Sequence, residues 1–141
     1  MPLSVEKIPS DQRPAWKRLL GRLRELAPLV VAFSGGVDSS LLLAAATVAL
    51  GPGVPAAICL GPFTAPWEAE RARELAAELG AELIEIDADE LDQPEIAAND
   101  SLRCYHCKRL RLGLLTELAR ARGWKSVVEG RSVDLGGRRI I

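Results

Sequence analysis

One short segment limits the fold more than any other. An apolar run, Leu29 to Phe33, leads directly into the glycine loop Ser34-Gly35-Gly36-Val37-Asp38-Ser39-Ser40. A continuous apolar run is typical of a strand buried on both faces, as parallel sheets contain. The apolar stretch from Ser39 to Leu50 then has the length of a buried helix, and Gly51-Pro52-Gly53 ends it. A strand, a glycine loop and a helix in this order predict an α/β fold.

The same alternation continues along the chain. Apolar patterning predicts further strands at Val54 to Leu60, Glu82 to Asp87 and Ser126 to Glu129, and helices at Arg13 to Leu26, Pro66 to Leu79 and Tyr105 to Arg122. Ala88 to Leu102 is expected to be a loop. Alternating strands and helices imply a parallel sheet flanked by helices, with right-handed crossovers. We expect a helical segment at residues 1–28 and a nucleotide-binding domain at residues 29–141.

The glycine loop has the chemistry of a phosphate site. Glycines allow the backbone to turn sharply, and the free N–H groups at a helix start favour an anion. The hydroxyls of Ser34, Ser39 and Ser40 can add donors. The Asp38 carboxylate would repel phosphate unless a cation lies between them, which suggests Mg²⁺. No lysine completes a Walker-type loop, so the usual P-loop NTPases are excluded.

Charge and cysteine usage limit the expected ligands and the expected cellular location. The formal net charge of -1 provides no long-range field for nucleic acid. The first residues lack the pattern of a secretory signal, and the longest apolar run is too short to span a bilayer, so a cytoplasmic protein is expected. Two of the three cysteines, Cys104 and Cys107, have the spacing of paired metal or cluster ligands. Cys59 is expected to pack as a small core residue rather than to supply a third ligand.

The loop 34–40 resembles the signature of the PP-loop superfamily, the ATP pyrophosphatases of the adenine nucleotide alpha-hydrolase-like fold. That resemblance implies cleavage of ATP between its α- and β-phosphates and transfer of AMP to a substrate oxygen. It also implies that the adenine lies near Ala32, Phe33 and Ile58 to Leu60. The residues it marks as nucleotide-binding are Ala32, Ser34, Gly35, Gly36, Val37, Asp38, Ser39, Ser40 and Gly130.

A second segment is more specific. Arg103-Cys104-Tyr105-His106-Cys107-Lys108, with Asn99 before it, resembles the LarE family of ATP-dependent sulfur transferases. The similarity spans roughly Leu29 to Asp134 and includes Pro66, Glu68 and Gly130. It implies MgATP-dependent adenylation of a carboxylate on a nicotinate-derived mononucleotide, followed by sulfur transfer for a nickel-pincer cofactor. By the same resemblance Lys108 and Asp38 are catalytic, and Cys104 and Cys107 are partial ligands of a [4Fe–4S] cluster or zinc.

The match to that family is partial. The segment after Glu129 departs from the family pattern. This sequence also lacks the C-terminal half of the family's proteins, which carries much of their oligomer surface. We therefore expect a chain truncated at its C-terminus, and self-association stays open. Two alternatives remain: a tRNA-thiolating enzyme using a basic face of Lys108, Arg109, Arg111, Arg120 and Arg122, or an ATP- or metal-binding module without turnover. The structural interpretation of that basic face is a solvated helix exterior.

Overall fold

A parallel sheet forms the centre of the molecule. The computed structural model describes residues 8–62, 64–88 and 103–130, with the backbone alone at residues 103–108. Within these residues four strands pair side by side in the order β3-β2-β1-β4, every pair parallel. They are β1 (Leu29–Ala32), β2 (Pro55–Leu60), β3 (Glu82–Asp87) and β4 (Ser126–Glu129). The predicted α/β architecture is confirmed. The loop expected at Ala88 to Leu102 lies outside the described residues except for Ala88, which belongs to no helix or strand.

The helices follow the predicted segments closely. They are α1 (Arg13–Leu26), α2 (Val37–Leu50), α3 (Pro66–Leu79) and α5 (Arg103–Arg122). Two starts differ from the prediction: α5 begins at Arg103 instead of Tyr105, and α2 begins at Val37 instead of Ser39. The start of α2 is earlier because the N–H of Ser40 already donates to the carbonyl of Gly36, at 2.9 Å. Val37 and Asp38 therefore belong to the first helical turn rather than to the loop before it.

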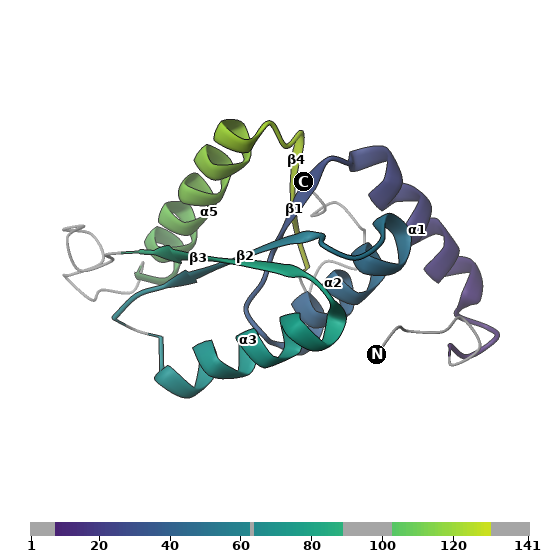
Figure 1. Cartoon of the computed structure of the whole chain (residues 1–141), viewed down its shortest axis with the longest axis horizontal. Helices are drawn as coiled ribbons and strands as arrows, with labels where there is room; N and C mark the ends of the chain where they lie inside the picture. The colour runs from purple at the N-terminus through teal and green to yellow at the C-terminus, as the bar shows by residue number, and fades with distance from the viewer. Residues whose placement is uncertain (1–7, 63, 89–102, 131–141) are drawn as a thin grey trace.

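The two faces of the sheet carry separate cores. Side chains alternate along each strand, so Val31 and Ile58 point to one face while Val30 and Cys59 point to the other. Helices α1, α2 and α3 cover the first face and α5 covers the second (Figure 1). The glycine loop and α5 thus lie on different sides of the same strand ends.

Small residues bring the first layer close to the sheet. The inner stripe of α3 consists of buried alanines: Ala69, Ala72 and Ala76. The α1 helix packs on α2 and buries Trp16, Leu20 and Leu23 in the same cluster. No helix within the described residues has both the length and the apolar character needed to cross a membrane.

One exposed ion pair joins this layer to the sheet edge. Arg73 of α3 hydrogen-bonds and pairs with Glu85 of β3. The hydrogen bond from Arg73 is the main cause that lowers the pKa of Glu85 below its ordinary value of 4.5. The same bond raises the pKa of Arg73.

Strand order creates the position for a ligand. The chain places β2 and then β3 on one side of β1, and afterwards returns to place β4 on the other side. In open parallel sheets, ligands bind outside the carboxyl ends of the strands where the order reverses in this way. Here that point lies above β1, between β2 and β4, next to the glycine loop.

Candidate nucleotide-binding site

The glycine loop is held in shape by two serines. The N–H of Ser34 donates to Oγ of Ser39 at 3.1 Å, and the two hydroxyls lie 3.0 Å apart. The hydroxyl of Ser39 is also 3.4 Å from the Gly36 carbonyl, which can accept from it. Ser39 is only 6% exposed, and its bonds to Ser34 and Gly36 form a small, partly buried network. The network fixes where the strand ends and where α2 begins.

Backbone conformation sets the rest of the loop. Gly35 has φ +82°, a left-handed conformation that L side chains rarely adopt. Gly36 has ordinary extended angles and is the N-cap of α2. Because the N–H groups in the first turn of a helix have no helical acceptor, they are available to an anion at this point. The exposed carboxylate of Asp38 lies in the same first turn.

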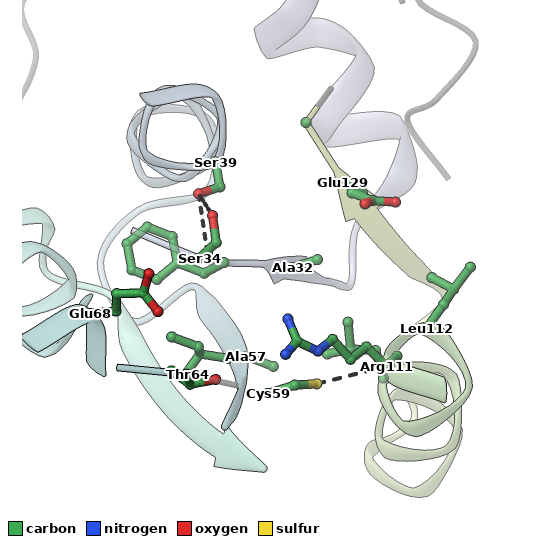
Figure 2. A pocket seen from close by; sticks show the side chains of 14 residues that line it. Ala32, Ser34, Ser39, Ala57, Cys59, Thr64, Glu68, Arg111, Leu112 and Glu129 are labelled. Atoms are coloured by element: carbon green, nitrogen blue, oxygen red, sulfur yellow. Dashed lines mark hydrogen bonds between the residues drawn. The ribbon is translucent and has the colours of Figure 1, made fainter. Parts of the chain in front are cut away.

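A cavity of about 310 Å³ opens beside the loop at the carboxyl end of the sheet. Its size is at the lower end of the range for small-molecule sites. It is bounded by the ends of β1, β2 and β4, by the loop before α3, and by α5 (Figure 2). The lining residues are Ala32, Phe33, Ser34, Ser39, Ala57, Ile58, Cys59, Thr64, Glu68, Arg111, Leu112, Leu115, Glu129 and Gly130.

Several residues named from the sequence meet in this wall. Ala32, Ser34, Ser39 and Gly130 line the cavity, together with Phe33 and Ile58 of the expected adenine region. Gly35, Gly36, Val37, Asp38 and Ser40 belong to the same loop and helix start without lining it. The hydroxyl of Ser40 is buried and makes no hydrogen bond within the described residues.

Gly130 connects β4 to the start of α2. A Cβ atom at Gly130 would lie 3.1 Å from the carbonyl oxygen of Asp38 and 3.6 Å from Leu42. The first distance is too short for an unstrained contact, so the neighbouring backbone would have to shift. The absence of a side chain at Gly130 therefore lets the end of β4 lie against the first turns of α2.

Charged side chains in the cavity were only partly foreseen. Glu68 accepts from the N–H of Ala65 at 3.1 Å, which fixes it at the N-terminus of α3. Glu129 ends β4, and Arg111 enters from α5. The sequence pattern predicts Arg111 only as part of a basic helix face. It lines the cavity instead, whereas Arg109, Arg120 and Arg122 are exposed. Helical spacing could have found it, since Arg111 precedes the buried Leu115 by four residues.

The structure describes the side chain of one of the three cysteines. Cys59 is buried in the core beneath α5, as expected, and its thiol donates weakly to the carbonyl of Arg111 at 4.0 Å. Cys104, Cys107 and Lys108 belong to the first turns of α5, but their side chains lie outside the described part. Nowhere in the described part do three His, Cys, Asp or Glu side chains gather around a common point. The cluster ligands and the catalytic lysine therefore stay predictions.

The sequence of this fold matches a known family. The family model described as asparagine synthase matches residues 19–129, which contain all four strands and the cavity. The chain belongs to the asparagine synthase family. This family uses the PP-loop, so the resemblance drawn from Ser34 to Ser40 is confirmed.

Curated relatives agree with the finer resemblance. A pyridinium-3,5-bisthiocarboxylic acid mononucleotide synthase from Lactiplantibacillus plantarum, a LarE protein, is 33% identical over 113 residues, which are 79% of this chain and 41% of the relative. An uncharacterized protein from Synechocystis sp. is 34% identical over 110 residues, 78% of this chain and 41% of that protein. The chain thus spans about two fifths of the length of these relatives.

Solved structures support the fold. A glutamine-dependent NAD+ synthetase from Acinetobacter baumannii, in complex with ADP, superposes with a TM-score of 0.71 at 21% identity, over 86% of this chain and 26% of that chain. An NMN synthetase from Francisella tularensis gives a TM-score of 0.67 at 20% identity, over 89% of this chain and 54% of that chain. These similarities establish the adenine nucleotide alpha-hydrolase-like fold.

Proposed function

We propose that this chain is the nucleotide-binding part of an enzyme that uses MgATP to adenylate a carboxylate of a nicotinate-derived mononucleotide, as a step toward sulfur transfer. The observation that carries the proposal is the cavity that joins the glycine loop to the ends of β1, β2 and β4. The 33% identity to a pyridinium-3,5-bisthiocarboxylic acid mononucleotide synthase supports the choice of acceptor.

The reaction places clear demands on the site. A carboxylate oxygen of the acceptor attacks the α-phosphorus of ATP, and the bond from that phosphorus to the bridging oxygen breaks. Pyrophosphate leaves with the electron pair, and the acyl-adenylate remains. The amides at the start of α2 and the helix dipole would bind the departing phosphates, where negative charge grows. A sulfur nucleophile would then attack the acyl carbon and release AMP.

Magnesium fits the open side of the loop. Mg²⁺ in nucleotide sites usually takes one or two carboxylates and completes its shell with phosphate oxygens and water. Asp38 offers one exposed carboxylate in the first turn of α2, beside the predicted phosphate positions. Bound there, Mg²⁺ would screen the phosphate charges from each other. Asp38 would hold the ion at the end of the loop that faces solvent.

The rest of the proposal concerns α5. Cys104, Cys107 and Lys108 would lie at the N-terminal end of α5, whose later turns form one wall of the cavity. We retain Lys108 as a catalytic candidate and the two cysteines as ligands of an incomplete metal or cluster site. The protein would act on small molecules in the cytoplasm. The cavity position of Arg111 removes one member of the basic face that a tRNA substrate would need.

A pyrophosphate-release assay tests the proposal. Wild type is incubated with MgATP and nicotinic acid mononucleotide, and two products are quantified: pyrophosphate, and the AMP recovered after hydrolysis of the acyl-adenylate. Asp38→Asn is measured alongside. We expect equal amounts of the two products from wild type, and a loss of about a hundredfold in the variant, whose fold should be intact. Arg22→Gln changes a distant, exposed charge and serves as the control. ADP as the product, or full activity of Asp38→Asn, would contradict the assignment.

A further inference from the structure

The cavity contains one cation whose task the adenylation chemistry leaves unassigned. Arg111 is half-buried in the wall formed by α5, next to Leu112 and Leu115. It is the single Lys or Arg side chain among the described residues of that wall. Figure 2 shows its guanidinium extending from α5 over Cys59 and toward the middle of the cavity. Two residues earlier on the same helix, Arg109 is exposed.

The backbone of Arg111 lies against the sheet. Its carbonyl accepts the weak bond from the Cys59 thiol at 4.0 Å. Leu115, one turn later, is 5% exposed and packs in the core under α5. A side chain that starts from such an anchored turn loses less freedom when it binds a ligand, because its base is already fixed.

Arg111 is the positive charge in a wall whose other charged side chains are carboxylates. Glu68 and Glu129 are the other charged side chains in the described wall, so without Arg111 that wall would carry carboxylates alone. An anionic molecule would then enter against repulsion. A guanidinium offers paired N–H groups that match carboxylate and phosphate oxygens, and it does so most strongly in a partly dry cavity.

From this geometry we propose that Arg111 binds an anionic group of the acceptor, a ring carboxylate or a phosphate of a small heteroaromatic mononucleotide. The proposal rests on the proposed function. It assigns Arg111 to the acceptor and not to the phosphates of ATP because α2 and α5 cover opposite faces of the sheet. The phosphates of ATP are expected at the α2 side, where the loop amides are. An anionic acceptor that approaches the α-phosphate would contact the cavity wall on the α5 side.

Binding measurements separate this role from nucleotide binding. The full chain is titrated with α,β-methylene ATP and Mg²⁺, and then, with that analogue saturating, with nicotinic acid mononucleotide. Arg111→Gln removes the charge, Arg111→Lys retains it, and Arg109→Gln removes an exposed charge from the same helix. We expect Arg111→Gln to weaken mononucleotide binding about tenfold to a hundredfold, with Arg111→Lys intermediate and Arg109→Gln unchanged. The affinity for the ATP analogue should change less than about twofold in all three.

A second titration identifies the anion. Nicotinamide mononucleotide retains the phosphate but carries a neutral amide in place of the ring carboxylate. Equal loss with both mononucleotides assigns Arg111 to the phosphate, and loss with nicotinic acid mononucleotide alone assigns it to the carboxylate. Weaker binding of the ATP analogue by Arg111→Gln, equal effects of the Gln variants at 109 and 111, or a wild type that binds the analogue but neither mononucleotide would overturn the proposal. A wild type that fails to bind the analogue would instead refute the proposed function.

Discussion

The hydroxyl of Ser39 should contribute more to the free energy of unfolding than any other hydroxyl in the glycine loop. It accepts from the Ser34 N–H at 3.1 Å, shares a bond with the Ser34 hydroxyl at 3.0 Å, and can donate to the Gly36 carbonyl at 3.4 Å. Ser39→Ala would remove all of these. The neighbouring Ser40 hydroxyl is buried but has no such bonds within the described residues, so Ser40→Ala is a matched comparison.

The magnitude follows from these contacts. Each net hydrogen bond contributes about 0.5–1.5 kcal/mol, and the longest of the three contributes least. Ser34 is exposed, so water can satisfy part of what Ser39→Ala leaves open. We therefore expect a loss of about 1–2 kcal/mol in unfolding free energy, or roughly 3–8 °C in Tm. Removing a buried hydroxyl that lacks partners is nearly neutral, so Ser40→Ala should lie within about 0.5 kcal/mol of wild type.

Two assays on the same samples test this difference. Urea denaturation gives the unfolding free energy, and titration with α,β-methylene ATP gives nucleotide affinity. The loosened loop of Ser39→Ala should also bind the analogue about tenfold more weakly, which corresponds to about 1.4 kcal/mol. Equal stabilities of the two alanine variants would refute the bonding network. Unchanged affinity in Ser39→Ala would separate that network from the phosphate site.

Two further substitutions test the loop backbone and the sheet edge. Gly35→Ala places a side chain at φ +82°, which should lower the unfolding free energy by about 1–2 kcal/mol. The new Cβ would lie at an ordinary 3.5 Å from Ala72, so the backbone conformation and not a clash causes the loss. Urea denaturation should show it, with a smaller loss for Gly36→Ala, whose backbone angles are normal. Glu85→Gln removes the partner of Arg73. Because the folded pKa of Glu85 is lowered, its contribution is present above about pH 4.5 and disappears as pH falls through the lowered pKa. The difference in stability between wild type and Glu85→Gln should therefore be present at pH 7 and shrink as pH falls through the lowered pKa. A difference that grows as pH falls would contradict the assignment.

Much of the fold could be predicted because the informative patterns are local. The apolar run before Ser34 and the alanine stripe of α3 identify their elements without reference to the rest of the chain. Strand order could not be obtained in this way, since the pairing of β1 with both β2 and β4 depends on contacts about 25 to 100 residues apart. The position of the cavity between β2 and β4 depends on that order.

The candidate site divides along the same line. The glycine loop was identifiable because its residues are contiguous and their chemistry is distinctive. Thr64, Glu129 and Arg111 come from separate elements, and only the folded chain brings them into one wall. The position of Arg111 in the cavity wall could not be predicted from the leucine-rich pattern of α5, because a charged residue on a helix is normally assigned to solvent. Its four-residue spacing from Leu115 was the available signal.

A crystal structure with α,β-methylene ATP and Mg²⁺ bound would test the central claim most directly. We predict phosphate oxygens within hydrogen-bonding distance of the backbone amides at the start of α2, with Mg²⁺ beside Asp38 and the adenine against Ala32 and Ile58. Phosphates located elsewhere on the surface, or a nucleotide that leaves those amides facing solvent, would contradict the assignment of this loop and the enzyme chemistry built on it.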